Sequence, residues 1–463
     1  MTVKPTFLAA ATTAVAFVVL LIARIRGLSQ FGFIGATGVI FCWIATVFAL
    51  PVMVLESEKI LRLVRPRTTP KRKSALFDVA SRFTVRFPRF ILVVSVIAAI
   101  LAIFVLVRFA PNAIEYDFTK MRNAVSVSGG TEALEKRVSK LFKHSMTPSA
   151  VLVDSVDEGR EVCDAVMRQN GALPLPKQRV GSCHSIVDLL PTDQEEKIPI
   201  MEKIDRLLSQ GWVKALDGEL KNKIDRVRRS ILGRVLTVND LPPALTQHFE
   251  DLEGNRGAVV FINPRPGMLL SDGRNLLRYA DTIREIHLPD GRVVGAVSEA
   301  IIFSDLIEII KREAPYLTLA SFLGVVGFVI FTLKKMRMSA VIVAGLVWGV
   351  LMMIGIAAFM DIKINFFNFI VLPLTFGIGV DYGINIAMRI HQEGPTGVAG
   401  AIRHTGGAVI LCSVTTIIGY FVLTTANNQA LATFGVAAVI GEITCIVAAI
   451  CLVPAVIVYF SRR

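Results

Sequence analysis

The sequence has little charge and few cysteines for its length. Charged residues make up 19% of the 463 positions and hydrophobic residues 53%, and the mean hydropathy is +0.59. This composition is too apolar for a soluble protein, yet it leaves room for one large polar segment. We therefore predict an α-helical polytopic membrane protein with one domain outside the membrane.

The chain also lacks a visible catalytic or metal-binding constellation. Its six histidines and six cysteines show no ligand spacing, and no nucleophile motif or phosphate-binding loop stands out. We expect no enzyme activity, no metal and no organic cofactor. Cys163 and Cys183 lie in the polar segment, but two cysteines without a spacing signature leave their pairing open.

Eight charge-poor runs can cross a bilayer, which takes about 20 apolar residues. They are residues 6–23, 31–55, 90–107, 316–333, 339–360, 364–388, 407–426 and 431–460. The predicted organisation is two helices in residues 1–58, a basic linker in 59–89, one helix in 90–108, a polar α+β domain in 109–315 and a five-helix bundle in 316–463. The spacing of apolar residues in the α+β domain predicts two β-α-β halves with a helical insertion.

The net charge of +13 does not indicate nucleic acid, because the excess lies at the membrane. Residues 109–315 contain 28 Lys and Arg against 30 Asp and Glu, whereas residues 59–89 are strongly basic. By the positive-inside rule the linker is cytoplasmic, so we expect residues 109–315 on the opposite side, in the periplasm of a Gram-negative bacterium.

Asp381 is the one acid between Lys363 and Arg389, and it lies inside a predicted span. A charged side chain at that depth costs about 2.5–3.5 kcal/mol on insertion scales, so such residues usually mark ion or proton pathways. Gly377 shares a helical face with Asp381, while Gly379 and Gly383 form a small-residue stripe on which another helix can pack. The alternative is an acid that only makes a structural hydrogen bond.

The two ends of the chain are related by an internal repeat. Residues 10–57 match 413–460 with a constant offset of 403 and no gap. Polar, glycine and proline identities in one register indicate a duplicated architecture. They include Thr12/Thr415, Thr13/Thr416, Gly32/Gly435, Cys42/Cys445 and Pro51/Pro454.

The motif Gly-Ile-Gly-Val-Asp-Tyr-Gly-Ile at 377–384, followed by Gly406-Gly407 and Thr415-Thr416, resembles the tenth to twelfth membrane helices of the RND superfamily. The resemblance is strongest to its MMPL-like and hopanoid-exporter (HpnN-type) branch. It implies proton-driven export of a lipid or other amphipathic molecule from the inner membrane toward the periplasm, with residues 109–315 as a porter domain.

The resemblance also assigns residues. Asp381 would carry the proton, with Tyr382 beside it. Ser413, Thr415 and Thr416 on the next helix would be its hydrogen-bond partners, unless they bond their own backbone. The second intramembrane acid, Glu442, has Val39 as its repeat mate, so we expect a structural hydrogen bond there.

The offset predicts that an N-terminal half is missing or is supplied by a partner polypeptide. Subtracting 403 from 381 places the first-repeat counterpart of Asp381 at −22, upstream of Met1. A late-assigned start, a neighbouring reading frame or a decayed gene would each explain this, and a homo-oligomer is a further possibility. Two functional alternatives stay open: a lipid- or sterol-sensing regulatory module, and an inactive fragment or one subunit of a split transporter.

Overall fold

The computed structural model describes residues 3–62, 75–121, 148–209, 218–230, 234–394 and 397–461, with the single residues 130, 134, 137 and 138. The chain divides into two compact units. One comprises Met1–Thr131 together with Leu306–Arg463 and is called the membrane unit here; the other is Glu132–Asp305. Of the predicted linker, residues 63–74 lie outside the described part of the chain.

The membrane unit is built from helices, and the predicted apolar runs correspond to them. Within the described residues, seven helices are long and apolar enough to cross a membrane, and a shorter apolar helix covers Thr6–Ile22. The helices are α1 (Val3–Val19), α2 (Arg26–Arg62), α3 (Ala75–Arg86), α4 (Pro88–Phe109), α13 (Glu299–Leu333), α14 (Met336–Phe359), α15 (Val371–Glu393), α16 (Val398–Thr424), α17 (Gln429–Val447) and α18 (Val453–Ser461).

Local sequence explains where several of these helices begin or bend. Pro88 opens α4 because its missing N–H is not needed in the first turn. Asn428 caps α17, since its side-chain oxygen accepts hydrogen bonds from the N–H groups of Ala430 and Leu431. A π-helical turn, Ala448–Leu452, comes just before Pro454 and joins α17 to α18. The last predicted run is therefore one bent span.

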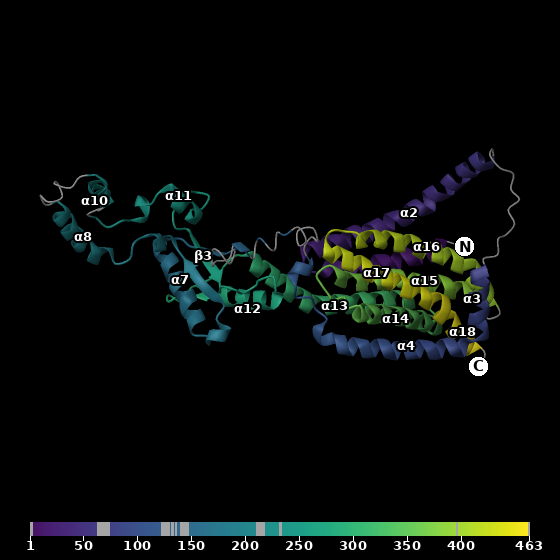
Figure 1. Ribbon diagram of the computed structural model, residues 1–463. Coiled ribbons are helices and arrows are strands. Elements are labelled where there is room, and N and C mark those ends of the chain that lie inside the picture. Colours follow the sequence, from purple (N-terminus) through teal and green to yellow (C-terminus); the bar gives the residue numbers. More distant parts are fainter. Residues whose placement is uncertain are drawn as a thin grey trace. The chain divides into compact units, whose positions relative to one another are not determined.

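Helix α15 is the centre of the bundle. It contacts α1, α14, α16, α17 and α18, and Figure 1 draws it beside α14, α16 and α17. Its apolar side chains join three buried clusters, through Val371 and Leu374, through Val380 and Ile384, and through Ile386 and Ile390. The helix that carries the glycine and aspartate motif is thus held on several sides.

The internal repeat is visible as two hairpins of the same geometry, α1–α2 and α16–α17. A Cβ added at Gly32 would lie 2.9 Å from Cβ of Leu20, and one added at Gly435 would lie 3.0 Å from Cβ of Leu423. An aromatic pair follows the same offset, because the rings of Phe17 and Phe31 are 5.6 Å apart and those of Tyr420 and Phe434 are 6.2 Å apart. The duplication predicted from the sequence is confirmed in these contacts.

The unit Glu132–Asp305 contains a three-stranded antiparallel sheet in the order β1 (Ser149–Leu152), β3 (Val259–Pro264), β2 (Val180–His184). Val297 adds a bridge to Ala150 at the β1 edge. The two predicted β-α-β halves therefore do not form separate sheets. They interleave in one sheet with the strand order of a ferredoxin-like fold, because each half leaves a gap that a strand of the other half fills. The predicted β-α-β halves are thus confirmed, and the structure adds that their strands interleave.

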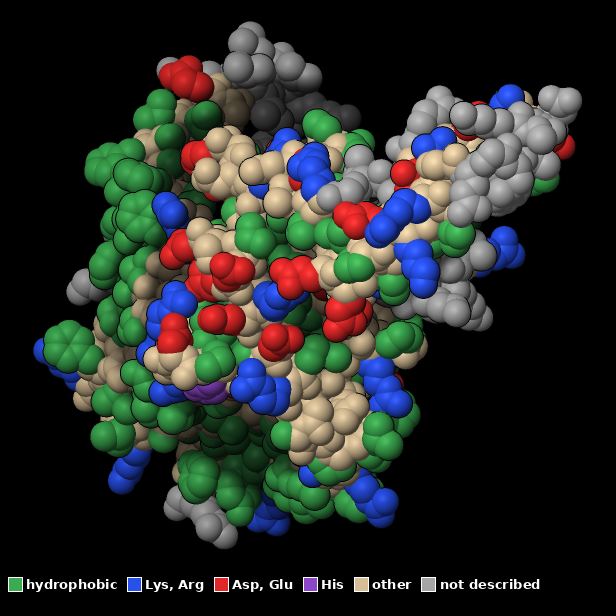
Figure 2. All heavy atoms as spheres, turned by 90° about the vertical axis from the view of Figure 1, so that its left-hand side faces the viewer, with side chains coloured by type: hydrophobic (Ala, Val, Ile, Leu, Met, Phe, Trp, Pro, Cys, Tyr) green, Lys and Arg blue, Asp and Glu red, His purple; other side chains and the backbone are tan. Residues whose placement is uncertain are grey.

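Helices complete this unit and also form its insertion. They are α7 (Val156–Gly171), α8 (Gln194–Leu208), α10 (Glu219–Ser230), α11 (Pro243–Thr246) and α12 (Gly273–Ile283), with a short hairpin of β4 (Ile286–His287) and β5 (Val293–Val294). Helices α8 and α10 fall in the predicted helical insertion. Acidic and basic side chains are mixed over the face drawn in Figure 2, as the near-balanced composition of this segment predicts.

Two interactions fasten helices of this unit to its sheet. A disulfide joins Cys163 on α7 to Cys183 on β2, which answers the question that the sequence left open. Tyr279 on α12 is fully buried; its hydroxyl lies 3.0 Å from Oγ of Ser149 and donates to the carbonyl of Ile262 at 2.9 Å. Burial raises the pKa of Tyr279 to about 12, so the hydroxyl keeps its proton even at a pH where a free tyrosine ionises.

The fourth predicted span, residues 316–333, is the second part of a longer helix. α13 is one continuous helix from Glu299 to Leu333, and it contains Pro315. It begins in one compact unit and continues in the other.

Candidate intramembrane acid site

Asp381 lies on α15 and receives two hydrogen bonds from α1. The hydroxyl of Thr12 donates to Oδ1 at 2.5 Å, and the hydroxyl of Thr13 donates to Oδ2 at 3.2 Å. Thr12 is fully buried and Thr13 is 9% exposed. Each oxygen of the carboxylate therefore has a donor inside the bundle, which offsets part of the cost of placing an acid there.

The hydroxyl group of Thr12 has one proton and lies near three possible acceptor oxygens. Besides Asp381, its hydroxyl lies 2.8 Å from the carbonyl oxygen of Ala9 and 3.0 Å from that of Leu8. A threonine hydroxyl donates one hydrogen bond and can accept two. When Asp381 is ionised, Thr12 can donate to it. When Asp381 is protonated, the acid can donate to Thr12, and the Thr12 proton can turn to Ala9.

The residues expected to bond Asp381 from the next helix lie elsewhere. Thr415 and Thr416 donate to the carbonyl of Cys412 on their own helix, at 2.6 and 3.1 Å. Ser413 is fully buried and lies beside Tyr382 and Glu442. The expected contacts with Asp381 are thus corrected: the threonine pair comes from α1 instead of α16, because α1 is the helix that packs on the aspartate face of α15.

Tyr382 points away from Thr12 and Thr13 and forms a hydrogen bond with Glu442, the second intramembrane acid. Its hydroxyl donates to Oε2 of Glu442 on α17 at 2.7 Å, and both side chains are buried. This hydrogen bond agrees with the structural role expected for Glu442. The sequence did not predict Tyr382 as its partner, because nothing in a single sequence specifies which face of α17 meets α15.

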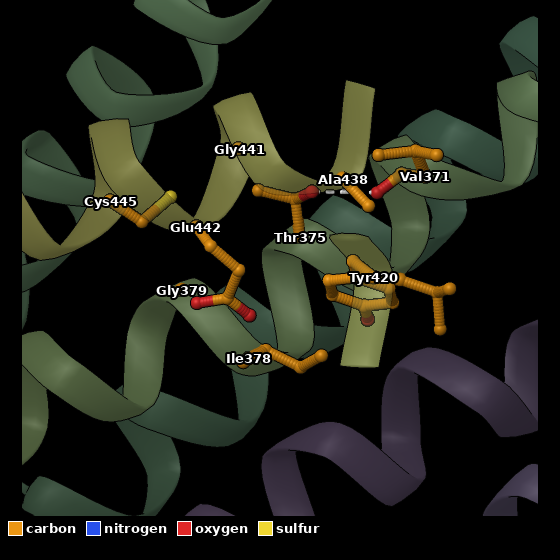
Figure 3. Close-up of a pocket in the computed structure, with 10 residues that line it drawn as sticks. Val371, Thr375, Ile378, Gly379, Tyr420, Ala438, Gly441, Glu442 and Cys445 are labelled. Carbon is orange, nitrogen blue, oxygen red and sulfur yellow. Dashed lines mark hydrogen bonds between the residues drawn. The ribbon is translucent and has the colours of Figure 1, made fainter. Parts of the chain in front are cut away.

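A small cavity adjoins Glu442 between α15, α16 and α17. Its volume is about 10 Å³, close to the lower limit for one water molecule. Figure 3 shows the Glu442 carboxyl group directed between Gly379 and Ile378, with Tyr420 across the cavity. Polar groups therefore extend from Tyr382 and Glu442 to the edge of this space.

The three glycines of the motif each allow a neighbouring helix to approach. A Cβ on Gly377 would lie 2.9 Å from Cβ of Ala16 on α1. One on Gly379 would lie 2.6 Å from Sγ of Cys445 on α17, and one on Gly383 would lie 3.3 Å from Ile342 on α14. The glycine spacing thus corresponds to three separate helix contacts.

The fold and the buried acids define a multi-pass helical membrane protein. Residues 271–463 match the model of the MMPL family. In sequence the chain is similar to Putative membrane protein MJ1562 of Methanocaldococcus jannaschii, with 26% identity over 202 residues, covering 42% of this chain and 52% of that protein. In structure it is similar to SecDF of Thermus thermophilus, a translocon-associated membrane protein, with a TM-score of 0.52 and 13% identity.

The likeness to SecDF concerns the fold. It covers 99% of this chain and 48% of the SecDF chain. The chain therefore spans about half the length of each of these two proteins.

Proposed function

We propose that this protein is a transporter of the RND type that couples proton movement to the export of a lipid or other amphipathic molecule. The observation that carries the proposal is the pair of hydrogen bonds from Thr12 and Thr13 to Asp381. The match of residues 271–463 to the MMPL family model supports RND-type membrane transport. The choice of a lipid, including a hopanoid, rests on the resemblance of the motif at 377–384.

Proton binding at Asp381 follows from how the site meets both charge states. The ionised acid accepts from two hydroxyl groups, and the protonated acid has Thr12 as an acceptor. Neither state leaves the carboxyl group without a partner, so the acid can gain and lose a proton while α1 and α15 stay together. A purely structural acid needs hydrogen bonds in one state alone.

The direction of transport follows from charge. The basic residues of 59–89 and those near Lys334 and Arg403 lie on one side when the spans are threaded alternately, and we assign that side to the cytoplasm. Residues 109–315 are then periplasmic and the membrane unit lies in the inner membrane. The disulfide between Cys163 and Cys183 supports this assignment, since disulfides persist in oxidising compartments.

The test is proton flux in vesicles in which the unaltered protein moves protons. Asp381→Asn keeps the shape and one acceptor but cannot carry a proton, so we expect flux to fall to background while membrane insertion is unchanged. Asp361→Asn, an exposed acid between α14 and α15, is the matched control and should retain flux. Undiminished flux in Asp381→Asn would overturn the proposal.

A further inference from the structure

Helix α3 lies at one end of the membrane unit and runs crosswise to α4 (Figure 1). It contacts α16 and α18. Its Val85 packs against the buried cluster of Ile386 and Ile390 on α15, and its Ser81 and Thr84 are buried. Because spanning helices run along the membrane normal, a helix that crosses their ends lies in the plane of the membrane surface. One face of α3 thus fixes it to the bundle.

The opposite face of α3 is apolar and exposed. Val79 and Phe83 lie on it one turn apart, and Phe83 is 44% exposed. Phe87, between α3 and α4, and Phe90, in the first turn of α4, continue this stripe and are also exposed. The centre of the Phe83 ring lies 5.6 Å from that of Phe87 and 6.1 Å from that of Phe90. Such an aromatic cluster on an amphipathic helix is typical of a surface that enters the boundary between headgroups and acyl chains.

Three arginines run beside the apolar stripe. Arg82 and Arg86 lie one turn apart on α3, Arg89 follows in the first turn of α4, and all three are exposed. Cζ of Arg86 lies 5.6 Å from the centre of the Phe87 ring, so the charged and aromatic groups are in contact. In the part of the chain that the structure describes, none of the three guanidinium groups forms an ion pair. Asp78 is the one acid of residues 75–90, so positive charge prevails here.

We propose that this surface binds an anionic phospholipid of the adjoining membrane leaflet. We call it the α3 corner, and its residues are Arg82, Phe83, Arg86, Phe87, Arg89 and Phe90. Guanidinium groups donate paired hydrogen bonds to phosphate oxygens, so the arginines fit the headgroup. The phenylalanine rings, followed along α4 by the exposed Val93 and Val94, fit the acyl chains.

Both parts of the α3 corner are needed to choose this ligand. A free phosphate ion would use the arginines and leave the aromatic rings in water. A zwitterionic lipid would use the rings, but its headgroup carries a cation that the arginines repel. An anionic phospholipid satisfies both parts, because its charge and its acyl chains are on one molecule. The bound lipid stays at the surface, so the proposal does not depend on proton-coupled transport or on its substrate.

The experiment uses the full chain in phosphatidylcholine liposomes that contain a trace of a photoreactive lipid. The probe is either phosphatidylglycerol or phosphatidylcholine, with the same photoreactive acyl chain, and adducts are mapped by mass spectrometry. The charge-free stretch of α2 around the exposed Phe48 provides the reference labelling. Relative to that stretch, we expect the phosphatidylglycerol probe to label residues 82–94 at least about fivefold more than the phosphatidylcholine probe, since one basic side chain near a membrane changes the attraction to anionic lipid about fivefold.

The matched variants each remove two exposed positive charges. Arg82→Gln with Arg86→Gln should reduce the preference for phosphatidylglycerol at residues 82–94 by about tenfold or to the level at Phe48. Lys334→Gln with Arg337→Gln should leave it unchanged. These two residues lie on the same side of the membrane when the spans are threaded alternately, and they are exposed and belong to the α13–α14 connection and to the start of α14.

Three results would overturn the proposal. One is equal labelling of the α3 corner by the two probes in the unaltered protein, a comparison that needs no variant to fold. Another is an equal loss of preference in the two double variants, which would show a general effect of surface charge. The third is removal of the phosphatidylglycerol adducts by excess inorganic phosphate, which would show a site for the free ion. None of these readouts depends on transport, so failure here leaves the proton-flux result unaffected.

Discussion

The hydroxyl of Thr12 lies 2.5 Å from Oδ1 of Asp381, across 369 residues of sequence. The contact joins the first helix of the chain to the aspartate helix and places the acid at the interface of the two repeats. Transporters built from repeats commonly have their sites at such an interface. Replacing the threonines therefore changes the hydrogen bonds of Asp381 without removing the acid.

Replacing both donors should weaken proton transfer. In Thr12→Val with Thr13→Val, the ionised form of Asp381 loses two hydrogen bonds, each worth about 1.5–3 kcal/mol when the acceptor is charged. We expect proton flux to fall by about tenfold or more. The double variant Thr424→Val with Thr425→Val is the control, because it removes two hydroxyls that bond their own helix. Equal flux in the two double variants would contradict a role for the α1 threonines.

Glycine at 377 is required by the approach of α1, and glycine at 419 is not. Gly377→Ala would place a Cβ 3.0 Å from Cα of Thr13, so the backbone must move, at a cost of about 1–3 kcal/mol. Gly419→Ala meets open space and should be neutral or slightly stabilising, since alanine favours helix. Thermal unfolding of both variants in detergent measures the difference. A Gly377→Ala protein as stable as Gly419→Ala would show that α1 does not pack here.

The Tyr382 hydroxyl should stabilise the bundle through Glu442. Tyr382→Phe removes the donor and leaves a buried carboxyl group without it, which costs about 1–3 kcal/mol. Glu442→Gln retains an acceptor and should cost less. The exposed Tyr316 provides the control substitution Tyr316→Phe. If Tyr382→Phe unfolds at the same temperature as Tyr316→Phe, the hydrogen bond contributes nothing to stability.

The disulfide should contribute to the stability of the unit Glu132–Asp305. It closes a loop with a sequence separation of 20, and chain-entropy arguments assign about 3 kcal/mol to such a loop. Cys163→Ser with Cys183→Ser, made in the full chain, should unfold at lower denaturant, and a reductant should have the same effect on the unaltered protein. Cys42→Ser, at an exposed free cysteine, should change nothing. A reductant that leaves the unaltered protein unaffected would argue against the bond.

Topology can be tested with a membrane-impermeant thiol reagent on spheroplasts. Ser271→Cys lies in the segment assigned to the periplasm and should react in intact cells. Arg337→Cys, an exposed position in the first turn of α14, should react after lysis alone. The reverse pattern would invert the orientation and the direction of export.

Much of the membrane unit was predictable because a bilayer imposes simple rules on apolar length. The predicted runs match helices, and the constant offset correctly anticipated two equivalent hairpins. The resemblance assigns Ser413, Thr415 and Thr416 on the adjacent helix as partners of Asp381, whereas the structure places Thr12 and Thr13 of α1 there. Which helix packs on the aspartate face depends on how the helices assemble, and a hydropathy pattern does not specify it. The offset did contain the signal, since it pairs Thr12 with Thr415 and Thr13 with Thr416.

The unit Glu132–Asp305 was predictable in its element order and not in its sheet. Short continuous apolar runs at residues 150–153 and 258–262 are typical of buried strands, and the residues between Val156 and Asn170 have helical spacing. The interleaved strand order arises from long-range pairing of β3 with both β1 and β2. Such pairing leaves no local trace in the sequence, as the bridge between Ala150 and Val297 illustrates.

The two hairpins have the same internal contacts although they pack on the bundle through different helices, α1 against α15 in one and α17 against α14 and α15 in the other. A Cβ added at Gly32 would lie close to Leu20, just as one added at Gly435 would lie close to Leu423. The shape of each hairpin is therefore set by its own two helices, in keeping with membrane helices that form before they assemble. During synthesis, α1 and α2 can enter the bilayer and close on each other long before α15 is translated. Until then the hydroxyl of Thr12 would bond only to its own helix. Its hydrogen bond to Asp381 would form late in biogenesis.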